Sequence, residues 1–517
     1  MLMLPHSRSN CAHPVTEENT SDETLRRSSC ARTLASLYCA LSRSYIRSGH
    51  FGSRSVAMNA SRFPPGPKFA IGAYLSLYRD PLNYGFRITR RYGDIVHLHL
   101  AGVHHYIVAH PDYVKAVLLA DESEMLRSIH RRLKRLLGRG LLSSQGEFHA
   151  AQRRLIQPSF NKQQVAAYAG VVAEYGERER DRWRNGQTFD ITEEMMSLTM
   201  AIIVKVLFGA DIENEGHDIA RNLETIVAMT HRKRVLFRSK RKRERAQAQL
   251  DAFVFDLIEQ RRTGAGCTGS PLHTKDGRDH PDFLSALLNL QFPEDWTPQQ
   301  RDRQVRDEAM TMFAAGHETV ASSMAWTWYL LSQHPEVETR LHRELDAVLA
   351  GRTPTVDDLH SLTYTGMVVA ESMRLYPPVW TMARRNVKDF PLGDYVIPAG
   401  SYIHVSQYLL HRDPRFFPDP ERFDPMRWTP EATAARPRFS YFPFGAGSRK
   451  CVGENLAMVE AILLLAILAQ RWSLRLVAGA NNKPRPLVTL RPAYGTIMKL
   501  EERLRANFSE AHDCAHA

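Results

Sequence analysis

The segment of this sequence best suited to chemistry is a glycine-rich loop that holds one cysteine. The loop, PFGAGSRKCVGEN at 443–455, leads directly into an apolar, helix-like stretch. Its glycines let the backbone bend closely around the Cys451 sulfur, and the following helix directs its positive end at that atom, which stabilises a thiolate. Cys451 is an inert buried thiol, a catalytic nucleophile that needs a histidine base, or a ligand of a metal or haem; the loop favours the last interpretation.

The number of cysteines narrows the kind of cofactor. One thiolate cannot build a zinc or iron–sulfur site, but it can be the single axial ligand of a haem. Of the six cysteines, three lie in the first 40 residues, and only Cys451 lies in a strongly patterned region. This distribution argues against a disulfide scaffold and predicts a reducing, cytoplasmic compartment.

A second candidate is AAGHET (314–319), midway along a long apolar helical stretch. Gly316 is expected to leave room above a flat cofactor, and the Thr319 hydroxyl can bond back to the helix and loosen it. Glu318 is an acid in an apolar run, which is costly unless the acid is used. A simple helix kink with a hydrogen-bonded threonine is the alternative.

Two charged patterns could support such a site. Glu371 and Arg374 of ESMR share a helix face and can pair, although such pairs are common on solvated helices. His149 and Arg153 of HAAQRR lie one helical turn apart and face the same way. A pair on the protein surface is the alternative there.

The motifs, and the order in which they follow one another along the chain, resemble those of the cytochrome P-450 family. The loop at 444–453 matches the family's haem-ligand pattern F-x-x-G-x-R-x-C-x-G. AAGHET is similar to the family's oxygen-activating pair of an acid and an alcohol. ESMR, with the downstream PERF at 420–423, is similar to its structural triad. The resemblance covers residues 63–500.

The resemblance implies which residues act in catalysis. Haem b (iron protoporphyrin IX) would be bound with Cys451 as the axial ligand of its iron. Thr319 would hydrogen-bond to the activated oxygen, and Glu318 would relay protons from solvent.

It also implies which residues hold the cofactor and the fold. Glu371, Arg374 and Arg422 would form a structural cluster without chemistry. The histidine and arginines would bind the haem propionates, although Arg385 could replace its neighbour Arg384. The predicted cofactor-binding residues are Cys451, His149, Arg153, Arg384, Arg449, Phe444, Gly445 and Gly453.

The expected fold is mainly α with a smaller β-rich region (α+β), which is the cytochrome P-450 fold. The haem would lie between a long central helix, at about 305–333, and the helix after the cysteine loop. The segment 93–111 reads as a β-hairpin, and short strands are expected at 390–406.

Three regions are expected along the chain. Residues 1–57 show no helical period or apolar signal core, and predict a disordered extension or an upstream start, with Met58 as the true first residue. Residues 58–505 are expected to form a single haem-thiolate monooxygenase domain. Residues 506–517 are expected to be a flexible tail.

The activity implied is a monooxygenase that inserts one oxygen atom from O2 into a lipophilic small molecule, such as a terpenoid, fatty acid or steroid-like compound. NAD(P)H would act only indirectly, through a ferredoxin or flavodoxin and its reductase, because no flavin or iron–sulfur segment follows the cysteine loop. A haem-thiolate peroxygenase or isomerase and a non-catalytic haem-binding sensor are the alternatives. The predicted pocket residues are Met310, Phe313, Ala314, Val379 and Met382.

Charge and hydropathy exclude two further classes. The net charge is +12, and much of it comes from the run HRKRVLFRSKRKRER at 231–245. This run belongs to no nucleic-acid-binding motif, so it predicts a solvated helix face and no nucleic-acid partner. The apolar run AILLLAILA at 461–469 is shorter than the roughly 20 residues of a membrane span, so no transmembrane anchor is expected.

Overall fold

The computed structural model describes most of the chain between residues 63 and 503. The predicted extension at 1–57, the predicted tail at 506–517 and the first part of the basic run, 231–236, lie outside the described residues. The described ranges are 63–68, 70–129, 131–212, 219, 221–223, 225, 237–263, 272–273, 279–280, 283–290, 292, 294–480 and 482–503.

Helices form the larger part of the described chain. The α-helices are α2 (Ala70–Arg79), α3 (Pro81–Tyr92), α4 (Pro111–Leu119), α5 (Arg131–Leu137), α6 (Gly146–Ile156), α7 (Lys162–Arg182), α8 (Ile191–Phe208), α10 (Phe237–Thr263), α11 (Phe283–Leu288), α12 (Pro298–Gln333), α13 (Pro335–Leu349), α14 (Thr363–Leu375), α15 (Gln407–Leu410), α16 (Pro430–Ala434) and α17 (Glu454–Ala469). Short 3-10 helices are η2 (Gln157–Phe160), η3 (Val356–His360), η4 (Pro425–Trp428) and η5 (Gly447–Arg449).

The strands form small sheets. The largest has the order β1-β2-β10-β7-β3 and contains β1 (Ile95–Leu100), β2 (Val103–Val108), β3 (Met125–Arg127), β7 (Met382–Asn386) and β10 (Tyr402–Val405). A second sheet has the order β11-β14-β4, from β11 (Trp472–Leu476), β14 (Ile497–Glu502) and β4 (Thr188–Asp190). The two-stranded pairs are β5 (Leu272–His273) with β6 (Asp279–His280), β8 (Phe390–Leu392) with β9 (Tyr395–Ile397), and β12 (Pro484–Pro486) with β13 (Leu490–Pro492).

The hairpin expected at 93–111 is present as β1 and β2. The two strands are antiparallel, with Ile95 opposite Val108 and Leu100 opposite Val103. Ala101 and Gly102, at the turn, have φ angles of 51° and 77°. Two consecutive residues with positive φ form the kind of turn whose twist matches that of the flanking strands.

Helix α12 organises the core. It begins with a capping box, in which the Thr297 hydroxyl accepts from the Gln300 amide and the Gln300 side chain accepts from the Thr297 amide. Most of its side chains are buried on all sides, as expected for a helix surrounded by others. The helix starts seven residues before the expected position, because its first turns are polar and show no apolar period.

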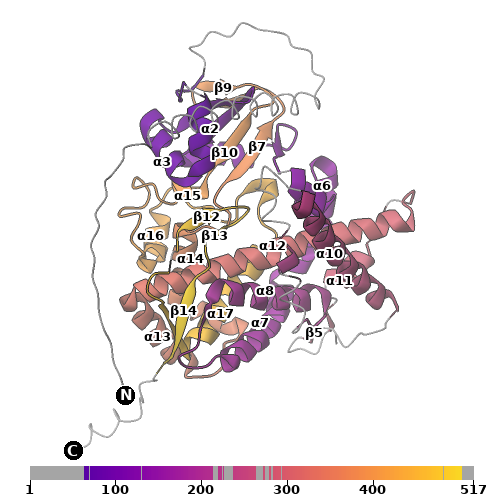
Figure 1. Cartoon of the computed structure of the whole chain (residues 1–517), viewed down its shortest axis with the longest axis vertical. Coiled ribbons are helices and arrows are strands. Elements are labelled where there is room, and N and C mark those ends of the chain that lie inside the picture. Colours follow the sequence, from indigo (N-terminus) through magenta and orange to yellow (C-terminus); the bar gives the residue numbers. More distant parts are fainter. Residues whose placement is uncertain are drawn as a thin grey trace, which may run out of the picture.

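The arrangement matches the expected fold class. Figure 1 shows α2, α3 and the five-stranded sheet at one end of the molecule, with α12 crossing the other part among α7, α8, α14 and α17. The model is mainly helical with a smaller β-rich region, which confirms the α+β prediction. Among the described residues, none of the helices combines the length and apolar character that crossing a bilayer requires.

Candidate active site

The cysteine loop depends on glycine at two positions. Gly445 and Gly447 have φ angles of 69° and 70°, in the left-handed region that other residues rarely adopt. A Cβ atom on Gly447 would also lie 2.4 Å from the carbonyl oxygen of Leu118 in α4. The resulting bend lets the Cys451 amide donate a 2.9 Å hydrogen bond to the Phe444 carbonyl. The loop conformation therefore follows from its glycines and from the close approach of α4.

Cys451 is a free cysteine between the short helix η5 and α17. The residue has exposed surface, yet burial raises the pKa of its thiol. The Gly453 amide, which donates to the sulfur, opposes this rise, as do the charges of Arg127 and Arg153, whereas Glu454 adds to it. Gly453 is also the residue before α17, so the helix directs its positive end toward the sulfur. The amide, the helix end and the two arginines favour a thiolate, whereas burial and Glu454 oppose it, and a metal cation at the sulfur would shift the balance to the thiolate.

A group of exposed residues interrupts the buried length of α12. Ala314, Ala315, Gly316 and Thr319 have solvent-accessible surface, although α12 is otherwise largely buried in this region. The Thr319 hydroxyl donates a 2.8 Å hydrogen bond to the Ala315 carbonyl. This turn of α12 is therefore accessible to solvent, and Thr319 supplies a hydroxyl to it.

The role expected for Gly316 is wrong. A Cβ atom on Gly316 would lie 2.7 Å from two carbon atoms of the Ile203 side chain in α8. The missing side chain therefore allows α12 and α8 to pack closely, and the space it leaves is filled by Ile203. Ala315 is the exposed residue on this turn of α12.

Glu318 is held away from solvent by a residue that the sequence did not indicate. Its side chain is 4% exposed, and its carboxylate accepts a hydrogen bond from the Thr489 hydroxyl. The next residue, Leu490, accepts a 2.9 Å hydrogen bond from the Trp326 indole of α12. The turn between β12 and β13 is thus fixed to α12 at two points, one of them the predicted catalytic acid.

Several guanidinium groups gather beside Cys451. Arg127 and Arg384 are register partners on β3 and β7, so their side chains leave the sheet on the same face. Burial, followed by repulsion from Arg384 and Arg449, lowers the pKa of Arg127 to about 9. Burial and repulsion from Arg449 lower the pKa of Arg384 to about 10. Arg153 donates a 2.7 Å hydrogen bond to the Lys450 carbonyl, which places its charge against the cysteine loop.

One carboxylate opposes these cations. Glu122, between α4 and β3, lies 2.7 Å from Nε of Arg449 and accepts a 2.8 Å hydrogen bond from its Nη2 atom. Its Oε1 atom also lies 3.2 Å from Nδ1 of His149. The structure therefore brings together the predicted propionate residues His149, Arg153, Arg384 and Arg449.

These residues fit a haem. Four guanidinium groups opposed by Glu122 leave three positive charges, and the two propionates of a haem would neutralise two of them. Unpaired buried charge is strongly unfavourable, so the cluster requires anions. Arg385 is exposed and donates a weak 3.5 Å hydrogen bond to Gly400 on the other side of β7, so Arg384 is the arginine directed into the cluster.

Arg127 and Glu122 were missed in the sequence. Arg127 lies on a short strand that pairs with the strand of Arg384. The sequence alone does not show which strands pair, so it did not indicate Arg127. Glu122 lies in a loop, where no periodicity marks an inward-facing side chain.

The structural cluster is present, but its third arginine is wrong. Arg374 and Glu371 are completely buried and joined by two hydrogen bonds of 2.8 Å. The Arg422 side chain is exposed, and only its backbone carbonyl accepts from Arg374, at 3.1 Å. Arg427 takes the expected place, with Nε 3.4 Å from Glu371, and the Trp428 indole donates to the same carboxylate at 3.0 Å.

The predicted pocket residues divide into two groups. Ala314, Val379 and Met382 are half-buried, and Met382 lies 3.5 Å from the Cβ position of Gly445 in the cysteine loop. Phe313 is buried and stacks on Phe208 of α8 at 4.5 Å, and Met310 is fully buried in the core. The pocket prediction is therefore wrong for Phe313 and Met310, which face the core.

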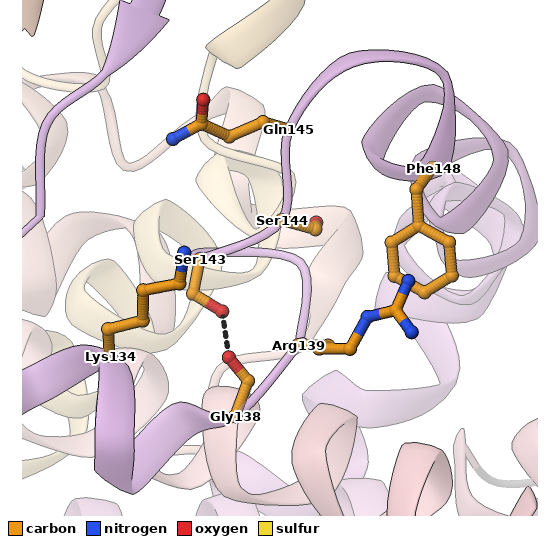
Figure 2. Close-up of a pocket in the computed structure, with 7 residues that line it drawn as sticks. All are labelled: Lys134, Gly138, Arg139, Ser143, Ser144, Gln145 and Phe148. Carbon is orange, nitrogen blue, oxygen red and sulfur yellow. Dashed lines mark hydrogen bonds between the residues drawn. The ribbon is translucent and has the colours of Figure 1, made fainter. Parts of the chain in front are cut away.

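A polar pocket of about 340 Å³ lies near the cation cluster. Figure 2 shows the Arg139 side chain against the Phe148 ring, with its guanidinium carbon 4.3 Å from the ring centre. The Ser144 carbonyl accepts a 2.8 Å hydrogen bond from Arg449, which connects this pocket to the cluster. The lining residues are Lys134, Gly138, Arg139, Ser143, Ser144, Gln145 and Phe148.

Comparisons with known proteins agree with this geometry. The family model described as cytochrome P-450 matches residues 63–499. Cyclooctat-9-en-7-ol 5-monooxygenase from Streptomyces melanosporofaciens is 38% identical over 81% of this chain and 90% of its own. Pentalenene oxygenase from Streptomyces avermitilis is 30% identical over 82% of this chain and 94% of its own.

A solved structure supports the fold. Cyanobacterial CYP120A1 with bound retinoic acid has a TM-score of 0.75 and 22% identity, over 86% of this chain and all of that one. The family match spans most of the chain, and the curated relatives exceed the identity at which family membership is secure. The chain therefore belongs to the cytochrome P-450 family, and it is a monooxygenase of that family.

Proposed function

We propose that this protein is a haem-thiolate monooxygenase that oxidises a terpenoid, with electrons supplied by a ferredoxin or flavodoxin and its reductase. The observation that supports the proposal is an exposed Cys451 in its glycine-rich loop, beside a cluster of guanidinium groups that Glu122 only partly neutralises. Such a cluster accepts a dianionic cofactor, and the sulfur is available as the single ligand of its metal.

The protein residues divide the work of holding the cofactor. Cys451 would be the axial ligand, kept as a thiolate by the Gly453 amide and the end of α17. Arg127, Arg384 and Arg449 would hold the propionates, together with His149 and Arg153 of α6. When bound, a haem with a thiolate ligand supplies the activation of O2 and the oxidation of the substrate.

Helix α12 supplies the groups that would accept, hold and release protons. The Thr319 hydroxyl donates its one proton to the Ala315 carbonyl, so its oxygen would accept a hydrogen bond from a group bound beside it. Glu318 would hold and release a proton after turning away from Thr489. Thr489 would then decide how readily Glu318 turns, because it holds the carboxylate in its buried position.

Two observations support a substrate class: the apolar residues predicted to line the pocket, and the names of two relatives. Ala314, Val379 and Met382 offer apolar surface, which suits a hydrocarbon. Relatives at 30–38% identity modify terpenoids, as the names of the monooxygenase and the oxygenase above indicate. A cyclic terpene or terpene alcohol is therefore the substrate class that this pocket supports best.

Electrons would enter near the cysteine loop. Lys450 is exposed there and pairs with Glu454, and Arg153 lies against the same loop. Cationic surface attracts an acidic partner and raises the rate of association. Ferredoxins and flavodoxins fit this requirement, and salt should slow electron transfer to the protein.

The test uses purified protein, a surrogate ferredoxin with its reductase, and a panel of cyclic terpenes, fatty acids and steroids. Substrates are detected by the shift of the haem absorption band from low to high spin. The proposal expects a terpene to give the strongest shift, together with NADPH- and O2-dependent product that carries one oxygen atom from O2. Product formation with hydrogen peroxide alone, and none with NADPH and O2, would contradict it in favour of a peroxygenase.

A further inference from the structure

Glu122 joins several parts of the propionate cluster. It forms an ion pair with Arg449, at distances of 2.7 and 2.8 Å, and accepts from the Gly146 amide at 2.9 Å and the Ser448 hydroxyl at 3.2 Å. His149 is its remaining neighbour, with Nδ1 3.2 Å from Oε1. One carboxylate therefore fixes the start of α6, the cysteine loop and the imidazole ring of His149.

Glu122 can only accept hydrogen bonds in this arrangement. Burial raises the pKa of its carboxyl group, but the hydrogen bond and charge of Arg449, with His149 and the Gly146 amide, lower it below its ordinary value overall. An ionised carboxylate has no proton to donate. Nδ1 of His149 lies 3.2 Å from this carboxylate as an ion-pair contact, so the negative charge favours the proton on that nitrogen.

Without a further anion nearby, the imidazole ring of His149 is neutral and carries a single N–H group. Burial and repulsion from Arg449 lower the pKa of His149 to about 4, while Glu122 opposes the shift and Arg153 and Arg127 add to it. A neutral imidazole carries one N–H, and here that N–H faces Glu122. Among the described residues, the Nε2 atom of His149 has no hydrogen-bond partner.

A propionate beside His149 would change this state. A neutral His149 would present a lone pair at Nε2 to a carboxylate, which is repulsive. A second negative charge favours the doubly protonated imidazolium, which can donate to Glu122 and to the propionate together. A neutral His149 with its proton on Nδ1 would therefore repel a haem propionate beside its Nε2 atom.

We propose that Glu122 is a positioning residue that keeps a proton on Nδ1 of His149, so that in the haem-loaded enzyme His149 is an imidazolium bridging Glu122 and a haem propionate. The inference rests on the proposed propionate role of His149. The charged groups that face the imidazole are Glu122 from the loop before β3, Arg127 from β3, Arg153 from α6 and Arg449 from the cysteine loop.

Reduction of the haem should then be linked to protonation. One added electron makes the haem more negative, and this raises the pKa of a neighbouring imidazolium. The reduced enzyme therefore holds the His149 proton to higher pH than the oxidised enzyme. It follows that the midpoint potential of the haem falls as pH rises through the titration of His149 and is level below it.

Spectroelectrochemistry of the haem-loaded enzyme tests this without substrate or redox partner. Midpoint potentials are measured from about pH 5 to about pH 9, the range in which a histidine titrates. The wild-type enzyme should show the sloping region. His149→Gln should lose the slope, because an amide can hydrogen-bond to both carboxylates but cannot titrate.

Two Glu122 variants separate charge from shape. Glu122→Gln removes a negative charge next to His149, which should move the sloping region down by about 1 pH unit or more. Glu122→Asp keeps the charge and should move it less. If Glu122→Gln does not load haem, the titrations of the wild type, His149→Gln and Glu122→Asp still test whether His149 sets the pH dependence of the potential.

Three results would overturn the inference: a pH-independent potential in the wild type, a slope that persists in His149→Gln, or a sloping region at unchanged pH in a haem-loaded Glu122→Gln. Each leaves the proposed function intact if the reduced, CO-bound enzyme still shows a thiolate-type absorption band. An imidazole-type band would instead refute the proposed function.

Discussion

Replacing Arg374 with alanine should prevent the chain from forming a stable haem protein. The side chain is fully buried and donates five hydrogen bonds, two to Glu371 and one each to the carbonyls of His411, Pro420 and Arg422. The variant leaves Arg427, at 3.4 Å, as the cation paired with Glu371, with Arg436 acting on it at longer range.

The magnitude follows from the loss of a buried partner. Removing one member of a buried ion pair costs about 3–5 kcal/mol, against a net stability of about 5–15 kcal/mol for a folded domain. A loss of 4 kcal/mol is nearly a thousandfold in the ratio of folded to unfolded protein. We therefore expect little soluble, haem-loaded Arg374→Ala protein, and a much lower denaturant midpoint for whatever is recovered.

The assay compares haem content per protein and guanidinium midpoints, followed by haem absorption and by circular dichroism. Arg422→Ala is the matched control, because the exposed Arg422 side chain leaves its backbone carbonyl in place and should change neither quantity. Arg374→Lys should be intermediate, since it keeps the charge but not the two-pronged pairing. An Arg374→Ala protein as stable as the wild type, or an Arg422→Ala protein as damaged as Arg374→Ala, would refute this reasoning.

The remaining predictions concern α12 and the cysteine loop. Thr319→Ala should keep the fold and haem but lower the ratio of product to NADPH consumed and raise hydrogen peroxide, whereas Thr319→Ser should retain most of the product; an unchanged ratio in Thr319→Ala would exclude a role in catalysis. Thr489→Val should alter the solvent isotope effect on turnover while Thr489→Ser restores it, because only a hydroxyl can hold Glu318; equal isotope effects in the two variants would argue against that contact. Gly447→Ala should lose haem, because of its positive φ and the 2.4 Å approach to Leu118, whereas Gly453→Ala, whose Cβ would lie 3.8 Å from Phe160, should lose much less; similar haem content in both would refute the steric argument.

Local patterns predicted the parts of the site that are continuous in the chain. The cysteine loop, the Glu371–Arg374 pair and the Thr319 turn each lie within a few residues, so their motifs could be read in the sequence, and the resemblance to the family then implied their roles. Arg422 was assigned in place of Arg427 because the chain between them turns through a proline-rich segment. No period shows which side chain there returns to Glu371.

Contacts between distant segments were beyond the sequence. Thr489 lies 171 residues from Glu318, and only the packing of the β12–β13 turn on α12 brings them together. The faces of α12 were also misassigned: polar and apolar residues of this helix are buried alike, so no polar stripe shows that Gly316 and Phe313 face α8. Glu122 and Arg127 were missed because short strands and loops carry too few residues for a readable alternation.

The central claim is that Cys451 is the axial thiolate of a haem, and the absorption spectrum of the reduced, CO-bound protein tests it most directly. Freshly purified wild-type protein should show the red-shifted band of a thiolate-ligated haem. Cys451→His should move the band to the shorter wavelength of imidazole ligation, with the fold retained by circular dichroism. A wild-type protein that is folded and haem-loaded, yet already shows the imidazole-type band, would contradict the account.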